Sequence, residues 1–174
     1  LIEMDKKTGK ISFNTRRTLS ANAFGHTAAY DTIIHSYLKQ ETFSENFSLT
    51  FTKHSNMRYG ENPHQNAAAY QIPNDDSNNI LNAKIHQGKK LSYNNIMDSD
   101  GALSCIKEFE TPTCVIVKHA NPCGFAVGDN NIQAFERAVS SDPVSYFGGI
   151  IGFNTKVSAH LAEKLVEPFL ECIV

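Results

Sequence analysis

The sequence predicts a layered α/β protein, and the pattern of its second half carries that prediction. Apolar, β-branched runs typical of strands lie at 114–117 and within 145–153. Segments with apolar residues at helical spacing lie before, between and after these runs, and Pro112 and Pro143 separate neighbouring elements. The resulting order is helix, strand, helix, strand, helix. Alternation of this kind is typical of helices that pack on a sheet.

Composition places the chain among ordinary globular proteins. Its 174 residues are enough to bury a core, and they include 41% hydrophobic and 20% charged residues. The formal charge of −2 gives no basic excess for nucleic-acid binding. No apolar run approaches the roughly 18 residues that a membrane-spanning helix needs, and the sequence shows no signal peptide. We therefore expect neither a nucleic-acid partner nor a membrane partner.

The cysteines and the chain ends give two further expectations. The cysteines are scattered and include no CxxC pair, so we interpret them as reduced thiols of a cytoplasmic protein. The chain opens without an initiator methionine and closes on an apolar segment, so we expect it to be a piece of a longer protein. The cysteines are Cys105, Cys114, Cys123 and Cys172.

The first third of the chain predicts a helical connector and then the start of a new unit. Apolar and alanine residues recur at helical steps from Thr15, which predicts a helix to about Leu38. The polar segment 39–50 is interpreted as a linker. Apolar and polar residues alternate over 47–51, which predicts a half-buried strand, and a second strand is expected to begin at 67–70.

A loop at 57–65 concentrates three side chains that carry chemistry. Its glycine and its Asn-Pro pair indicate an irregular segment. Arg58 is of the type that best recognises phosphate, Tyr59 is able to stack on a base, and His64 is able to move a proton. The alternative is a surface loop in which the arginine is only solvated.

Capping residues mark the beginnings of the helices in the second half. Polar residues with short side chains precede each run of helical spacing, as they do at helix N-termini. The expected caps are Asp98 or Asp100 for the helix through 101–106, Asp129 or Asn130 for the helix to Val139, and Ser158 for the final helix.

The segment 113–128 is the strongest candidate site from the residues alone. Its apolar run stops at Lys118 and His119, and we expect the following segment 120–124 to be a turn. A cation and an imidazole at the carboxyl end of a buried strand lie where open α/β sheets place ligands. The plainer alternative is a strand that ends in two polar surface residues.

Several stretches of the chain together resemble one family. They occur in the order and rough spacing of that family and cover nearly the whole chain: AFGHTAAYD at 23–31, MRYGENPHQNAA at 57–68, LSYNNIMDSDGAL at 91–103, VKHANPCGFAVG at 117–128 and SDPVSYFGGIIGFN at 141–154. The chain resembles the PurH family of bifunctional purine biosynthesis proteins. In this family aminoimidazole-carboxamide ribotide (AICAR) formyltransferase is fused to IMP cyclohydrolase.

The resemblance implies a domain organisation. Residues 1–46 correspond to the C-terminal tail of the cyclohydrolase domain plus a helical connector. Residues 47–174 correspond to the first half of the formyltransferase domain, a truncated three-layer α/β/α subdomain of cytidine-deaminase-like architecture. The second half of that domain, which supplies most folate contacts in the family, is expected outside this chain, as are the cyclohydrolase catalytic residues. The family's active site is shared across a homodimer.

The resemblance also assigns catalytic roles. The family transfers a formyl group from its co-substrate, 10-formyltetrahydrofolate, to the 5-amino group of AICAR during IMP synthesis in the cytoplasm. His119 matches the family's proton acceptor, and Lys118 matches its transition-state stabiliser. Adjacent residues of a strand point to opposite faces, so both side chains reach one site only where the strand ends and the chain turns.

The remaining site residues are assigned to the substrate. By the same resemblance Arg58 and Tyr59 bind the ribotide, with Arg58 suited to its phosphate. Gly148 lies where the backbone must approach the substrate closely, a place for a residue without a side chain. His64 and Asn95 fall in the family's motifs and are further substrate-binding candidates.

Two other functions compete with this interpretation. A zinc-dependent nucleoside deaminase shares the implied architecture, and Pro122-Cys123 matches the start of its P-C-x-x-C ligand pair. Position 126 is alanine, however, and His119 is followed by Ala-Asn instead of the x-Glu that supplies the acid–base group, so no metal is predicted. The second alternative is a catalytically incomplete ribotide-binding or dimerisation fragment.

Overall fold

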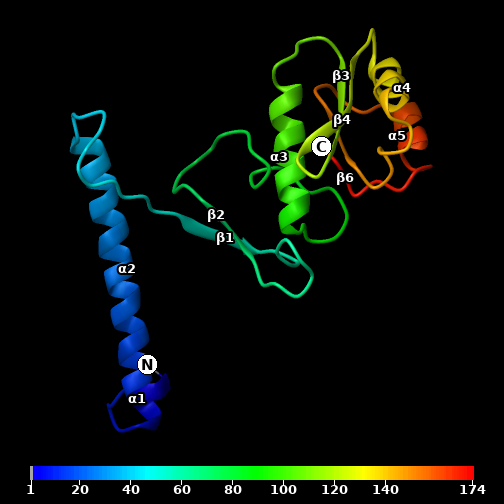
Figure 1. Ribbon diagram of the computed structural model, residues 1–174. Coiled ribbons are helices and arrows are strands. Elements are labelled where there is room, and N and C mark those ends of the chain that lie inside the picture. Colours follow the sequence, from blue (N-terminus) through cyan, green and yellow to red (C-terminus); the bar gives the residue numbers. More distant parts are fainter. Residues whose placement is uncertain (1) are drawn as a thin grey trace. The chain divides into compact units, whose positions relative to one another are not determined.

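A computed structural model describes residues 2–174 of the chain (Figure 1). The chain forms two compact units, of which the first ends at Thr52 and the second runs from Lys53 to Val174. Every residue of the candidate site lies in the second unit. Among residues 2–174 there is no helix whose length and apolar character would let it cross a membrane.

The first unit consists mainly of one long helix. Helix α2 (Phe13–Leu38) follows a short helix α1 (Ile2–Lys6). The Ser12 side chain caps α2 by accepting a hydrogen bond from the N–H of Thr15. The helix predicted from Thr15 to Leu38 is confirmed, although none of its side chains is buried.

A two-stranded sheet is formed by β1 (Thr52–Asn56) and β2 (Ala68–Gln71). Strand β2 confirms the strand predicted at 67–70. The strand predicted at 47–51 is wrong, because those residues form no strand and β1 begins only after them. All residues of β1 are exposed, so its position is set by pairing with β2 and not by burial of one face.

The second sheet has four strands in the order β4-β3-β5-β6. Strand β3 (Thr113–Lys118) is antiparallel to β4 (Asn121–Val127) and to β5 (Ile150–Phe153), while β6 (Cys172–Ile173) runs parallel to β5. The sheet is therefore mixed. Strand β3 lies inside it and is fully buried apart from its last residue, as its run of β-branched residues predicts.

Helices cover both faces of this sheet (Figure 1). Helix α3 (Tyr93–Ile106) packs on one face, while α4 (Asn131–Ser141) and α5 (Ala159–Leu165) pack on the other. Successive residues of β3 alternate between two cores, as the pleat of a strand requires. The core on α3 contains Val115, Val117 and Ile150 with Ala102 and Ile106; the core on α4 and α5 contains Cys114, Ile116 and Ile151 with Phe135 and Leu161.

The packing of the sheet against α4 is close. A Cβ placed on Gly124 would lie 2.4 Å from the carbonyl oxygen of Ala138, so only glycine fits on β4 at this point.

Burial raises the pKa of the Cys114 thiol to about 12, which agrees with its interpretation as a buried, reduced cysteine. The packing of helices on both faces of the mixed sheet confirms the α/β class predicted from the sequence.

Three boundaries around the site differ from the prediction. Helix α3 begins at Tyr93 because the Ser92 side chain caps it, so Asp98 and Asp100 lie inside the helix and not at its start. The turn predicted at 120–124 is confirmed only at Ala120, since His119 and Ala120 form the turn and β4 already begins at Asn121. Strand β5 is shorter than the predicted 145–153, since the residues before it form turns. The caps predicted at Asn130 and Ser158 are confirmed for α4 and α5.

Candidate functional site

A two-residue turn joins β3 to β4. Lys118 and Asn121 are paired across the two strands, which leaves His119 and Ala120 as the whole connection. Both have positive φ, 54° and 61°, the sign found at both central positions of a type I′ hairpin turn. Such turns favour Asn-Gly, and a left-handed conformation costs other residues about 1–2 kcal/mol each. The chain therefore holds His119 in a strained conformation immediately after Lys118.

The Asp98 carboxylate accepts hydrogen bonds from this turn. Its Oδ1 lies 2.7 Å from the N–H nitrogen of Ala120, and its Oδ2 lies 3.2 Å from that of His119. Asp98 is on the buried side of α3, with 8% of its surface exposed. Hydrogen bonds to a carboxylate are among the stronger ones, and here they satisfy a charge that burial would otherwise penalise.

Lys118 reaches the segment before β5. Its Nζ donates a hydrogen bond to the carbonyl oxygen of Phe147, at 2.9 Å. Among residues 2–174 no carboxylate forms an ion pair with Lys118. Hydrogen bonds from Ser145 lower the pKa of Asp142, and the charge of Lys118 adds a smaller contribution. The ammonium charge of Lys118 is thus held in place by a neutral carbonyl.

Gly148 follows the carbonyl that binds Lys118. Its φ of +71° is one that glycine adopts without strain, and its N–H donates to the Phe169 carbonyl at 2.8 Å. A Cβ at this position would meet only the Phe169 ring, at 3.8 Å. Backbone conformation therefore gives one reason for a glycine here, beside the predicted approach of a substrate.

Arg58 and Tyr59 form a pair on the loop at 57–65. The Arg58 Nη2 donates to the Tyr59 hydroxyl at 3.0 Å, and the guanidinium lies 4.7 Å from the centre of the Tyr59 ring. In the part of the chain that the structure describes, no ion pair includes Arg58. An exposed guanidinium without a carboxylate partner is available to bind an anion.

Backbone hydrogen bonds attach this loop to the beginning of α3. The N–H of Arg58 donates to the Leu91 carbonyl at 3.0 Å, and the Tyr93 N–H donates to the Tyr59 carbonyl at 3.2 Å. The Asn94 side chain adds a bond to the carbonyl of Glu61 at 3.1 Å. The loop is therefore fixed on the same helix that carries Asp98.

The two remaining predicted residues differ in exposure. His64 is exposed on the loop at 57–65. Asn95 is buried, and its Oδ1 accepts hydrogen bonds from the N–H and the hydroxyl of Ser92 in a capping box. The oxygen of Asn95 is thus occupied in starting α3, which leaves its Nδ2 as the group able to reach a ligand.

The structure connects the predicted residues in two ways. Lys118 and Gly148 are brought together by the contact with the Phe147 carbonyl. Helix α3 connects the other parts, since its start holds the Arg58 loop and its Asp98 holds the turn at His119. The arrangement supplies a cation, an imidazole and a guanidinium, which suit an oxyanion, a proton and a phosphate.

Asp98 is the site residue that the sequence interpretation missed. The sequence pattern predicts Asp98 near the start of a helix, where an aspartate serves as a cap. Once the capping box of Ser92 and Asn95 sets the start of α3, Asp98 falls on the stripe of Ala102 and Ile106, at spacings of four and eight residues. A carboxylate on a buried apolar stripe is the signal that points to a specific partner.

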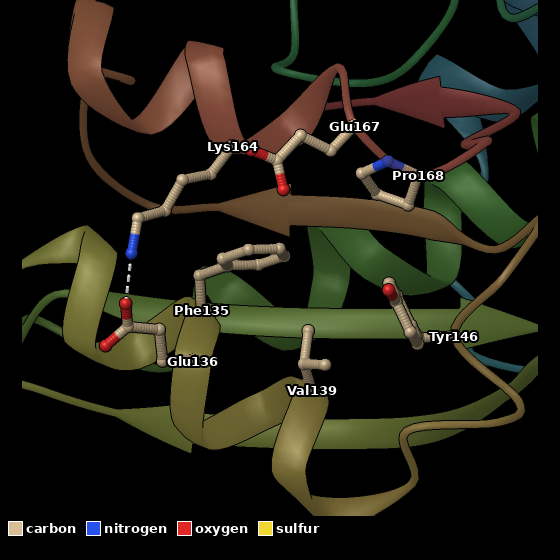
Figure 2. A pocket seen from close by; sticks show the side chains of 7 residues that line it. All are labelled: Phe135, Glu136, Val139, Tyr146, Lys164, Glu167 and Pro168. Carbon is tan, nitrogen blue, oxygen red and sulfur yellow. Dashed lines mark hydrogen bonds and ion pairs between the residues drawn. The ribbon is translucent and has the colours of Figure 1, made fainter.

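A groove lies elsewhere on this unit, between α4 and α5 (Figure 2). Its volume is about 630 Å³. Lys164 and Glu136 form an ion pair at one end, and Tyr146 and Pro168 lie toward the other end. None of the predicted site residues lines it. Within residues 2–174 there is also no group of three or more His, Cys, Asp or Glu side chains placed to hold a metal ion.

The fold and the site define a class: a mixed α/β protein with a lysine–histidine pair at the end of a buried central strand. The family model described as the AICARFT/IMPCHase bienzyme matches residues 1–174. The chain belongs to this family.

Curated bacterial relatives agree with this assignment. The chain is 46% identical to the bifunctional purine biosynthesis protein PurH of Caldicellulosiruptor saccharolyticus, over 97% of the chain and 34% of that protein. It is 48% identical to PurH of Lysinibacillus sphaericus, over 100% of the chain and 34% of the relative. PurH of Bacillus cereus strain B4264 is also 48% identical, over 97% of the chain and 34% of its own length. The chain thus spans about a third of the length of these relatives.

Proposed function

We propose that this chain supplies the ribotide side and the proton-accepting group of AICAR formyltransferase in de novo IMP synthesis. The observation that carries the proposal is the turn at His119, which places an imidazole directly after the ammonium of Lys118. Membership of the AICARFT/IMPCHase family supports it. The co-substrate in this proposal is 10-formyltetrahydrofolate.

The chemistry of the reaction explains why this pair is suited to it. The 5-amino nitrogen of AICAR attacks the formyl carbon of 10-formyltetrahydrofolate, and the bond from that carbon to N10 of the folate then breaks. The amine is conjugated to a carboxamide and is a poor nucleophile, so His119 accepts its proton. The ammonium of Lys118 stabilises the tetrahedral oxyanion between the two steps. Both functions require the two side chains at one reacting centre.

The ribotide is proposed to lie along the start of α3. Arg58 binds its phosphate and Tyr59 contacts its ring system. The role of Arg58 is supported by its lack of an ion-pair partner within residues 2–174. Gly148 lets the backbone approach the substrate. His64 and the Nδ2 of Asn95 complete the substrate-binding set.

The wider organisation follows the family. Residues 1–46 are the C-terminal tail of the cyclohydrolase domain and its connector, and residues 47–174 are the first, cytidine-deaminase-like subdomain of the formyltransferase domain. IMP cyclohydrolase activity and most folate contacts belong to the parts of the protein that the chain does not span. The complete protein is a homodimer whose subunits share the active site.

The alternative is a catalytically incomplete fragment that binds the ribotide or the partner subunit. One observation favours it for the chain by itself: the chain spans only about a third of its relatives. The two proposals predict the same residues at the ribotide and differ only in turnover.

Formyl transfer in the full-length protein is the direct test. Purified full-length protein with this sequence is expected to convert AICAR to its formylated product only when 10-formyltetrahydrofolate is present, because that folate supplies the formyl carbon. Product is measured by liquid chromatography, with a reaction lacking the folate as the control. Ribotide binding by the chain alone without turnover would select the incomplete-fragment alternative for the isolated chain. Absence of turnover in the full-length protein would contradict the formyltransferase proposal.

Arg58→Ala is expected to weaken ribotide binding by about 10- to 100-fold, the value of a charge-assisted hydrogen bond. Affinity for the unphosphorylated riboside should change by less than about threefold, since the lost contact is to the phosphate. Calorimetric titration of the full-length protein with each compound measures both affinities. Arg137→Ala is the matched control. Arg137 is also an exposed arginine, but it lies on α4 and donates a hydrogen bond to the Val127 carbonyl. An equal loss for ribotide and riboside would show that Arg58 does not bind the phosphate.

A further inference from the structure

The turn at His119 and Ala120 lacks the residues that usually stabilise its conformation. Both residues have positive φ, and neither is glycine or asparagine. The Asn121 side chain adds one local contact, a hydrogen bond to the His119 carbonyl at 2.9 Å. That contact does not use either N–H of the turn.

Asp98 is the side chain that binds both of those N–H groups. It comes from a different element, 21 and 22 residues earlier in the chain. Its carboxylate forms no ion pair within the described residues 2–174, so the turn is the partner that accounts for its burial. Ala102 and Ile106 fix α3 on the sheet below it and thereby fix the carboxylate.

We infer that Asp98 is a positioning residue for the reaction, and that it acts by holding the backbone of His119 in the left-handed conformation, which sets the direction of the imidazole at the end of β3. This inference rests on the proposed formyltransferase function. Asp98 itself does not touch the substrate in this arrangement. The carboxylate replaces, through two hydrogen bonds, the stabilisation that a glycine would give the turn.

The test compares three variants of the full-length protein. Asp98→Asn keeps one acceptor oxygen but places an amide N–H₂ against the second N–H of the turn. Asp98→Asn with Ala120→Gly keeps that defect and removes the strain at Ala120. Asp100→Asn is the matched control, because Asp100 lies on the same helix with its side chain exposed.

We expect Asp98→Asn to lower kcat by about 10- to 100-fold while the ribotide KM changes by less than about threefold, since the Arg58 loop is held by separate bonds. Ala120→Gly should restore at least about a fifth of the lost activity, because glycine adopts a positive φ without strain. Asp100→Asn should match the wild type. Unchanged kcat in Asp98→Asn, or no restoration by Ala120→Gly, would overturn the inference.

A second measurement separates this inference from the proposed function. Amide hydrogen exchange at His119 and Ala120, followed by NMR in this chain, is expected to be about tenfold faster in Asp98→Asn and unchanged in Asp100→Asn. This readout does not depend on turnover. If the full-length protein has no formyltransferase activity but exchange responds as expected, the proposed function fails while the role of Asp98 in the turn stands. Equal exchange in both variants and the wild type would refute that role.

Discussion

His119→Ala in the full-length protein is expected to lower kcat for formyl transfer by about 10²- to 10⁴-fold, the usual contribution of a general base. The 5-amino group of AICAR must lose a proton as it is formylated, and alanine cannot accept one. Ribotide affinity should change by less than about threefold, because the proposed phosphate ligand is Arg58. Steady-state kinetics with saturating folate gives kcat, and calorimetry gives the affinity.

His160→Ala is the control for this prediction. His160 is exposed on α5, where its Nδ1 lies 3.6 Å from the Oε2 of Glu163. It is not one of the proposed site residues. Its removal should leave turnover at the wild-type level. If His119→Ala turned over as fast as His160→Ala, His119 would not be the proton acceptor, and another group would have to be sought.

Lys118→Ala is expected to lower kcat by about 10²- to 10³-fold, the loss seen when one donor to a developing oxyanion is removed. In the resting protein its ammonium donates to the Phe147 carbonyl, so it is already placed before substrate binds. The oxyanion exists only between attack and departure of the folate nitrogen. Ribotide binding should therefore change much less than turnover. Kinetics and calorimetry on the same preparation measure both.

The matched control for Lys118 is Lys164→Ala. Lys164 pairs with Glu136 in the groove between α4 and α5 (Figure 2), and none of the proposed site residues lines this groove. It should leave kcat unchanged. A Lys118→Ala variant that lost ribotide affinity in proportion to kcat/KM, with kcat intact, would identify Lys118 as a binding group and not as a stabiliser of the transition state.

Local sequence patterns correctly predicted the elements that depend on nearby residues alone. The β-branched run before Lys118 forms β3, and the caps Asn130 and Ser158 begin α4 and α5. These signals succeed because a buried strand needs continuous apolar residues and a helix N-terminus needs a side-chain acceptor. The motif at 57–65 also forms a loop, as its glycine and its Asn-Pro pair indicate.

Patterns failed where partners distant in sequence determine the local structure. The alternation at 47–51 does not form a strand, because pairing with β2 begins only at Thr52. The sequence pattern predicts no strand at Cys172–Ile173, and these residues form β6 only through parallel pairing with β5. Two residues are too few to show the periodicity of a strand, whereas in the folded protein hydrogen bonds to the neighbouring strand are enough to form one.

By itself the sequence determined the α/β class and the family, and it predicted the site residues from Arg58 to Gly148, because composition, periodicity and motifs are all local properties. Only the tertiary structure decided that the turn consists of His119 and Ala120 and that Asp98 holds it. The physical reason is that a strained two-residue turn has no local signal when it lacks glycine. Its stability comes from a carboxylate on a helix that reaches it only after the sheet and α3 have packed together.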